Sequence, residues 1–313
     1  MTAFTSILVA TDFSLDGNNA VRRAALLAHE HGARLKLLHV LDASGCPPLR
    51  DWFSPSIDID LKAAQAQESL RRFAVEIAGR YDVAATAEVT VGEPLDTLLQ
   101  ASARADLLVV GRRGHGRLTS LWLGRTADRL LRTSRRPVLV VRTPLQGSYR
   151  RVLVPVDFTA TADAVLPLAA RLARHGHLQV FHAIDAHLDA LLRGTDLPEP
   201  VVREARLRQE AGAVARLRRQ AARLGLDSTR TGFAVTHGHP VWTTLNHARA
   251  FSADLIVAGK QGRSTLGEFL LGSVSRRILA ESRCDMLIVP RPRKTPPAPA
   301  ALPLHPALRL PIA

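Results

Sequence analysis

Short continuous runs of Val, Leu and Ile recur along the chain and alternate with longer stretches in which apolar residues follow a helical spacing. The apolar runs of the first half occupy residues 6–10, 37–41, 107–110 and 138–141. Continuous runs of this kind are typical of strands that are buried on both faces of a parallel sheet. Between the first two runs, Ala20, Val21, Ala24, Leu27 and Ala28 recur at helical spacing. The order predicts β-α-β-α-β-α-β-α-β, a doubly wound α/β domain.

The same pattern occurs twice along the chain. Residues 6–14 match 151–159, 37–42 match 180–185, 91–94 match 237–240, 105–107 match 253–255, and 137–141 match 285–289. Five blocks that recur in one order indicate an internal repeat of the whole fold. We therefore expect two tandem Rossmann-like domains, residues 1–146 and 147–290, each a five-stranded parallel sheet flanked by helices.

Several segments lie outside this regular pattern. Residues 43–60 and 186–200 form long irregular connections after the second strand of each repeat, and are candidates for lids or for surface excursions. The join at residues 143–150 is short, so we expect the two domains to pack together. Residues 291–313 are rich in Pro and Ala and are predicted to form an extended or disordered tail.

The composition agrees with two globular domains. At 313 residues the chain can bury two cores, and its 46% apolar and 22% charged content is that of a globular protein. The two cysteines, Cys46 and Cys284, provide neither a disulfide framework nor a metal site, which favours a reducing compartment. The first residues lack the features of a signal peptide, and no apolar run approaches the roughly 20 residues that span a bilayer. We therefore expect a soluble, cytoplasmic protein without a membrane partner.

The formal net charge is +14 and the isoelectric point is near 11.2. Such a charge attracts phosphates, nucleic acids and anionic membranes, but it does not define the fold. Much of it comes from arginines spread over predicted helices, such as Arg206, Arg208, Arg216, Arg218 and Arg219. These residues could form a solvated helix face or a non-specific nucleic-acid surface. Few aromatic residues interleave with the basic runs, so base stacking is not supported and we do not expect a nucleic-acid partner.

A glycine pattern follows the fourth apolar run of the second repeat. Gly259 and Gly262 are separated by two residues, and Gly272 and Ser273 follow after nine more. Ligands bind beyond the carboxyl ends of parallel strands, where glycines allow close approach of the backbone and N–H groups at a helix start bind anions. The spacing is not that of a Walker loop. It predicts a phosphate site held by Ser273 and by the first N–H groups of the next helix.

Asp157 directly follows the first strand of the second repeat, so it should reach the same edge of the sheet. It could contact the ribose or base of a nucleotide, with a metal-linked role as a further alternative. It could also be a turn or helix-capping residue. Ser14 and Thr159 stand near the starts of the first helices, where a hydroxyl can cap free N–H groups.

The first repeat carries an altered copy of the glycine pattern. Gly111, Gly114 and Gly124 are retained, but Arg125 stands where the second repeat has Ser273. A guanidinium could clamp a phosphate from the side, or it could fill the space that the phosphate would occupy. We expect the first site to be weaker or empty.

Taken together, these motifs resemble those of tandem universal stress proteins. The resemblance rests on the strand starts VATDFS and VPVDFT, the second strand LLHVLD and the two glycine patterns, and it covers residues 3–142 and 149–290. It implies a five-stranded sheet in each domain, with ATP bound at the strand ends. It also implies that the last strands, residues 138–141 and 287–289, pair across the domain interface. The site residues that the resemblance implies are Asp157, Ala183, Gly259, Gly262, Gly272 and Ser273 in the second repeat, and Asp12, Val40, Gly111, Gly114 and Gly124 in the first.

Histidine and nucleophile chemistry do not point to an enzyme. The close pairs His175/His177 and His237/His239 lack a carboxylate or thiol at zinc spacing, so no metal site is predicted. His39 and His182 end internal strands and are expected to be core residues. No nucleophile elbow or paired carboxylate is present, and no general base can be named, so at most slow ATP hydrolysis is expected.

The leading hypothesis is a cytoplasmic stress-response regulator that binds ATP, with Mg²⁺ as the candidate accompanying ion, mainly in the second domain. The alternatives are a nucleotide-independent scaffold that uses the basic surface and the Pro-rich tail, and a weak ATPase. A homodimer and an unidentified protein partner are both left open by the sequence.

Overall fold

The computed structural model describes residues 4–42, 55–113, 123–185, 198–260 and 271–291. Gly114, Gly262 and Cys46 lie outside the described residues. So do the Pro-rich tail and most of the two long connections.

Each repeat contains the predicted alternation of strands and helices. The first repeat contains β1 (Ser6–Ala10), α1 (Leu15–His31), β2 (Arg34–Leu41), α2 (Pro55–Tyr81), β3 (Ala85–Val91), α3 (Pro94–Ser102), β4 (Leu107–Gly111), α4 (Arg125–Thr133) and β5 (Val138–Val141). The second contains β6 (Arg151–Pro155), α5 (Thr161–Leu172), β7 (His177–Ile184), α7 (Glu199–Arg223), β8 (Thr231–His237), α8 (Pro240–Ala250), β9 (Leu255–Gly259), α9 (Ser273–Glu281) and β10 (Asp285–Val289).

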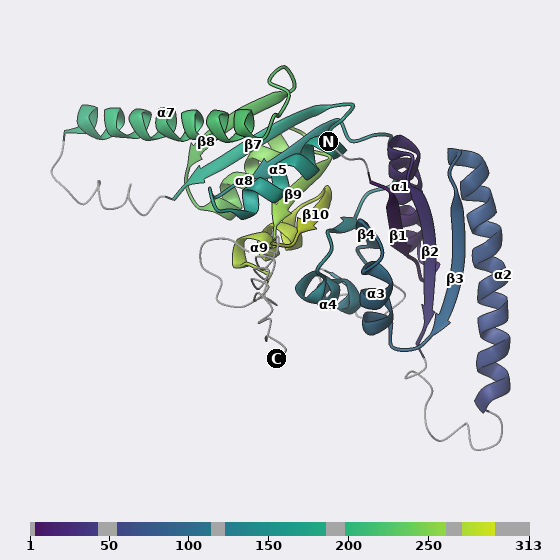
Figure 1. Cartoon of the computed structure of the whole chain (residues 1–313). Coiled ribbons are helices and arrows are strands. Elements are labelled where there is room, and N and C mark those ends of the chain that lie inside the picture. Colours follow the sequence, from purple (N-terminus) through teal and green to yellow (C-terminus); the bar gives the residue numbers. More distant parts are fainter. Residues whose placement is uncertain (1–3, 43–54, 114–122, 186–197, 261–270, 292–313) are drawn as a thin grey trace, which may run out of the picture.

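The strands form one continuous sheet of ten, in the order β3-β2-β1-β4-β5-β10-β9-β6-β7-β8 (Figure 1). Within each repeat the five strands are parallel, which confirms the predicted doubly wound α/β arrangement. The repeats join where β5 and β10 pair antiparallel, with Leu139 opposite Leu287. The pairing of the last strands, which the resemblance implied, is therefore confirmed. The paired halves extend the sheet across the domain boundary.

Burial along the strands explains the continuous apolar runs. All residues of β5 and β10, at the centre of the sheet, are buried, because helices cover both faces there. The edge strand β3 instead alternates between half-buried and exposed residues over most of its length. Alternate residues of one strand reach opposite faces: Ile7 and Val9 belong to the hydrophobic layer that includes residues of α1, α2, α5 and α7, whereas Leu8 belongs to the layer that includes residues of α3, α4, α8 and α9. The chain therefore has two hydrophobic layers, one on each side of the sheet.

A buried carboxylate also ties the two repeats together. Asp285, the first residue of β10, is fully buried. One of its oxygens accepts hydrogen bonds from the backbone N–H of Arg142 (2.8 Å) and from the N–H and hydroxyl of Thr143 (both 3.2 Å). The other accepts from the Tyr149 hydroxyl (2.7 Å) and lies 3.4 Å from Nε of Arg23 in α1. The linker and the first repeat thus converge on one side chain of the second.

The two candidate capping residues behave differently. Ser14 caps α1 as expected, because its hydroxyl accepts a hydrogen bond from the N–H of Gly17 at 3.1 Å. Thr159 does not cap α5. Its hydroxyl donates to Asp157 at 2.7 Å, and α5 begins two residues later, at Thr161, without a side-chain cap.

Candidate functional site

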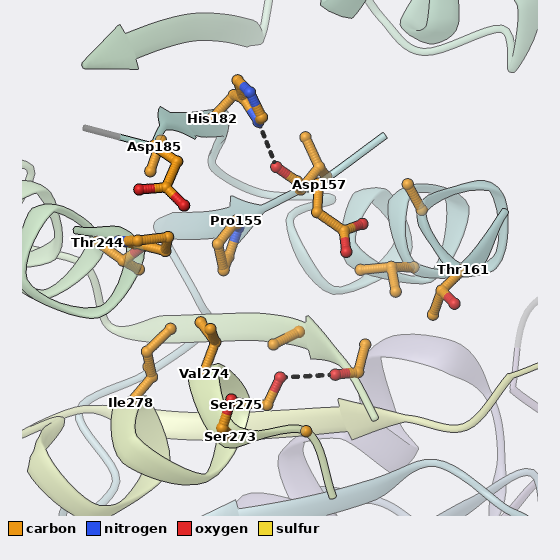
Figure 2. Close-up of a pocket in the computed structure, with 18 of the residues that line it drawn as sticks. Pro155, Asp157, Thr161, His182, Asp185, Thr244, Ser273, Val274, Ser275 and Ile278 are labelled. Atoms are coloured by element: carbon orange, nitrogen blue, oxygen red, sulfur yellow. Dashed lines mark hydrogen bonds between the residues drawn. The ribbon is translucent and has the colours of Figure 1, made fainter. Parts of the chain in front are cut away.

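A cavity of about 430 Å³ opens at the carboxyl ends of β6, β7 and β9 in the second repeat. Its walls come from these strand ends and from the first turns of α5, α8 and α9 (Figure 2). This is the edge at which ligands bind in doubly wound sheets, because the loops that leave neighbouring strands diverge there.

The predicted site residues of the second repeat meet at this cavity. Asp157, Ala183, Gly259, Gly272 and Ser273 all line it. They come from three strand ends and one helix start, far apart in the sequence, and Figure 2 shows Asp157 and Ser273 on different walls of the cavity. Gly262 lies in the segment outside the described residues. The structure therefore brings these residues to one place, and their assignment to ATP stays a prediction.

The start of α9 forms the polar wall of the cavity. Gly272 is the N-cap residue and offers no side-chain cap, and the first turn of α9 contains no acidic residue. The N–H of Gly272 donates to the carbonyl of Lys260, and the Ser275 hydroxyl donates to the carbonyl of Gly259 at 2.8 Å. The first N–H groups of a helix have no acceptor within the helix, and they carry its positive dipole end. Here they belong to residues that line the cavity, so this wall is suited to an anion.

Asp157 serves the local turn and also faces the cavity. One carboxylate oxygen accepts from the N–H of Thr159 at 3.1 Å and from its hydroxyl at 2.7 Å. The intervening residue, Phe158, has a φ of 61°. The interpretation as a turn residue is therefore confirmed. The same carboxylate lines the cavity, so the two roles are compatible.

Sequence reasoning missed several residues that shape the cavity. Thr161, Asp185, Pro240, Thr244 and Ile278 line it as well. Asp185 and Pro240 lie in blocks that recur between the repeats, and that recurrence was a usable signal. Thr244 and Ile278 are buried positions of helices, and no local pattern distinguishes such residues from ordinary core residues.

His39 is buried, as expected of a core residue, whereas His182 is only half-buried. Nδ1 of His182 lies 2.7 Å from the carbonyl of Val156, and Nδ1 of His39 lies 2.8 Å from the carbonyl of Thr11. Each histidine therefore ties the second strand of its repeat to the turn after the first strand. His182 also lines the cavity, which the sequence did not indicate (Figure 2).

The first repeat places its matching residues at equivalent strand ends. Asp12 follows β1, Val40 lies near the end of β2, Gly111 ends β4, and Gly124 is the N-cap of α4. Arg125 is the exposed first residue of α4 and occupies the position of Ser273 in α9.

The first site also differs from the second in a hydrogen bond that the sequence does not indicate. The carboxylate of Asp16 accepts a hydrogen bond from the N–H of Arg113 at 3.1 Å, within the glycine loop. The Ser14 hydroxyl donates to the carbonyl of Arg113 at 3.4 Å. The second repeat has Thr161 at the position of Asp16. In the first repeat, therefore, the N–H of Arg113, which could otherwise bind phosphate, already donates a hydrogen bond to a carboxylate of the protein.

Gly111 is required by close packing. A Cβ atom at this position would lie 2.6 Å from the carbonyl carbon of Asp16, in the first turn of α1. We expect Gly111→Ala to lower the free energy of unfolding by about 1–3 kcal/mol, because backbone atoms must move to relieve the clash. Urea unfolding measures the change.

Gly79→Ala in α2 is the matched control, because a Cβ atom there would meet no other group within 4 Å. Alanine at that helical position should raise the stability by about 0.5–1 kcal/mol. Equal effects of the two substitutions would contradict the packing role of Gly111.

Lys260, which directly follows Gly259, takes part in the domain interface. Its side chain is buried, and Nζ donates to the carbonyl of Ser134 at 3.2 Å. Ser134 is the C-cap of α4 in the first repeat. Burial lowers the pKa of the Lys260 ammonium. The loop lysine therefore does not act at the phosphate position, as a P-loop lysine does, but connects the loop to the other domain.

No group of three or more His, Cys, Asp or Glu side chains in the described ranges could hold a metal ion. Among the helices that the structure describes, none is both long enough and apolar enough to cross a membrane.

Comparisons with known proteins extend over both repeats. The model of the universal stress protein family matches residues 3–142 and 148–290. A universal stress protein of Mycolicibacterium smegmatis is 28% identical over 300 residues, which cover 92% of this chain and 97% of that protein. A universal stress protein of Thermus aquaticus is 34% identical over 145 residues, 44% of this chain but 99% of that protein. The latter match has the length of a single repeat.

The fold is also found in a solved structure. The crystal structure of a universal stress protein from Archaeoglobus fulgidus matches with a TM-score of 0.67 and 20% sequence identity. The match covers 92% of this chain and 98% of that chain. At this identity the similarity establishes the shared tandem fold.

Proposed function

The chain belongs to the universal stress protein family, and from that premise we propose that it is a cytoplasmic stress-response regulator that binds ATP in its second domain. The observation that carries the proposal is the cavity at the ends of β6, β7 and β9, with the uncapped start of α9 as one wall. A helix start without a side-chain cap or an acidic first turn is suited to bind phosphate.

The chemistry of the cavity fits a nucleotide. Its volume of about 430 Å³ lies in the range of roughly 300–1,000 Å³ that is usual for small-molecule sites. Pro155, Val165 and Ile278 supply apolar surface for a base, while Asp157 supplies a carboxylate that can accept hydrogen bonds from ribose hydroxyls. Ser273 and the N–H groups at the start of α9 would hold the phosphates. Bound ATP would supply the negative charge that this wall lacks, with Mg²⁺ as the accompanying ion.

Three differences between the repeats favour the second site. In the first repeat, Asp16 occupies the N–H of Arg113 and places negative charge beside the glycine loop. In addition, α4 has Asp128 in its first turn, whereas α9 has no acidic residue there. The Asp16 carboxylate opposes phosphate binding electrostatically, and Asp128 adds negative charge that its ion pair with Arg132 partly offsets. Arg125 adds bulk at the position that Ser273 takes in the second repeat.

The contact from Lys260 to Ser134 gives a physical route for regulation. A ligand changes a conformational equilibrium only if it binds one state better than another. Because Lys260 belongs to the glycine loop and is bonded to the C-terminal end of α4, ATP in the second site can favour one arrangement of the loop against the first domain. In this proposal the protein acts through that change and not through turnover of ATP.

Nucleotide retention tests the proposal. The purified chain is denatured, and the released nucleotide is identified and counted by chromatography. We expect ATP in the wild-type protein and its loss in the double variant Gly262→Val with Ser273→Ala, because the first substitution obstructs the loop and the second removes a hydroxyl ligand. Unchanged retention in that variant would refute the assignment.

The first repeat provides the matched control. Gly114→Val with Arg125→Ala changes the equivalent positions, and retention is expected to stay as in the wild type. Loss of nucleotide from this variant alone would reverse the assignment of the two sites. Equal loss from both variants would contradict the asymmetry.

A further inference from the structure

A second cavity, of about 290 Å³, lies beside the first in the second repeat. It lies between the start of α5 and the C-terminal half of α7, and we call it the arginine cleft. Its lining residues are Phe158, Thr159, Ala160, Asp163, Arg216, Arg219, Gln220 and Arg223. The first cavity is lined by Asp157 and Thr161. The single turn at residues 158–160 therefore separates the two cavities.

The charges in the arginine cleft are not balanced by the residues that the structure describes. Arg223 pairs with Asp163 at 2.6 Å, and Gln220 donates to the same carboxylate oxygen at 2.8 Å. Arg219 has no bonding partner in the part of the chain that the structure describes. The guanidinium of Arg216 lies over an aromatic ring, and no ion pair joins it to a carboxylate of the described residues. Of the three arginines that line the cleft, only Arg223 is therefore paired with a carboxylate of the described ranges, and two positive charges remain for a ligand.

Stacking holds Arg216 in place and leaves its donors available. Its guanidinium carbon lies 4.2 Å from the centroid of the Phe158 ring. The ring of Phe158 in turn lies 4.3 Å from that of His182. A stacked guanidinium uses its face for the aromatic contact, while the N–H groups in its plane can still donate to an oxyanion. Ordering the side chain in advance lowers the entropy cost of binding an anion.

The first repeat shows that the fold does not require these charges. The turns that end α2 and α7 are equivalent, because each contains the same backbone hydrogen bond. The N–H of Val83 donates to the carbonyl of Ala78 after α2, and the N–H of Leu226 donates to the carbonyl of Ala221 after α7. Counted from these turns, the positions of Arg216, Arg219 and Arg223 are taken in the first repeat by Phe73, Glu76 and Arg80. The equivalent surface there has one acidic and one basic residue. The excess positive charge is therefore a property of the second repeat alone.

We propose that the arginine cleft binds a small phosphate-bearing anion, at a site distinct from the nucleotide cavity. Paired guanidinium groups match the oxygens of a phosphate better than any other common anion-binding group in proteins. The volume is smaller than that of the first cavity, which favours an inorganic phosphate or pyrophosphate, or a small phosphorylated metabolite, over a second nucleotide. The proposal does not depend on ATP binding in the first cavity.

Calorimetric titration of the full-length chain tests this site. The probes are inorganic pyrophosphate and ribose 5-phosphate, added to the Gly262→Val, Ser273→Ala background so that the nucleotide loop does not contribute. Arg216→Phe with Arg219→Glu installs the residues that the first repeat itself carries. We expect this change to raise the Kd of the probe at least about tenfold, because two charged donors are lost. The probe that binds more tightly identifies the source of the phosphate group.

The control variant also replaces one arginine of α7 with Phe and one with Glu. Arg203→Phe with Arg218→Glu alters α7 at positions outside the cleft lining, and the Kd is expected to stay unchanged. An equal rise in Kd for both double variants would assign binding to the net charge of α7 and overturn the proposed binding site in the cleft. Failure of both probes to bind would also overturn it. If the double variant does not fold, Arg219→Glu alone replaces it, since this side chain makes no bond to other described residues, and at least a threefold rise in Kd is expected, roughly half a unit of log Kd.

Discussion

Replacing Asp285 with alanine is expected to lower the free energy of unfolding by about 3–5 kcal/mol. Asp285 is fully buried and accepts hydrogen bonds from Arg142, Thr143 and Tyr149. Without the carboxylate, the buried guanidinium of Arg23 loses its partner at 3.4 Å. An uncompensated buried charge is among the most destabilising consequences of a single substitution. Because these groups come from both repeats and from the linker, the loss should affect the cohesion of the two domains.

Tyr149→Phe distinguishes the contribution of one hydrogen bond to stability from that of the buried Asp285 charge. This change keeps the aromatic ring, which lies 4.1 Å from the guanidinium of Arg23, and removes only the hydroxyl. Burial raises the pKa of Tyr149 well above its usual value, so the hydroxyl is a donor to Asp285. We expect a loss of about 1–2 kcal/mol. Urea unfolding at neutral pH compares the two variants, and a smaller loss for Asp285→Ala than for Tyr149→Phe would contradict the role of Asp285.

Stability is expected to fall as the pH drops from about 6.5 to about 4, and His31 is a major cause. Burial, followed by the charges of Arg174, Arg171 and His175, lowers the pKa of His31 from 6.5 to about 4. Between these two values the unfolded chain binds a proton that the folded chain does not. The destabilisation therefore begins near pH 6.5, grows as the pH falls, and reaches its full size near pH 4.

The size of the effect follows from the pKa shift. Each pKa unit corresponds to about 1.4 kcal/mol, but His31 is only partly buried and keeps some hydration, so we expect a total of about 1–2 kcal/mol. His31→Gln should flatten the dependence of the urea midpoint on pH in this window. Some slope will remain, because burial also lowers the pKa of His247.

His29→Gln is the control for this measurement. His29 lies in the same last turn of α1 but is exposed. Its replacement should leave the pH profile unchanged. An unaltered profile in His31→Gln, or an equal flattening in both variants, would contradict the assignment to His31.

These two predictions concern the same boundary between the repeats. The arginines near His31 belong to the second repeat, and the Arg174 side chain also donates to the carbonyl of Glu30 in α1. Asp285 lies at the other contact, beside the paired strands β5 and β10. The domain interface is therefore held by polar groups at defined positions as well as by the continuous sheet.

The sequence by itself determined the repeat, the order of strands and helices, and the glycine pattern at the strand ends. Each of these depends on the identity and spacing of nearby residues, such as the run before Gly259 or the pair Gly272 and Ser273, and local spacing is preserved when a chain folds. The topology of parallel sheets then requires that the residues after neighbouring strands meet at one edge. That rule predicts that Asp157 and Ser273 lie at the same edge of the sheet, and both line the cavity there.

The tertiary structure alone decided which polar groups bond to one another across these elements. Asp285 lies in a block that recurs in both repeats, where its counterpart in the first repeat is Pro137. Nothing in the sequence indicates that Asp285 interacts with groups of the linker and of α1. Nor did the sequence show that Asp16 takes the N–H of Arg113, or that Lys260 reaches Ser134. Such bonds depend on distances of a few ångströms between residues that lie far apart in the sequence, such as Arg23 and Asp285, and only the packing of whole helices and strands sets those distances.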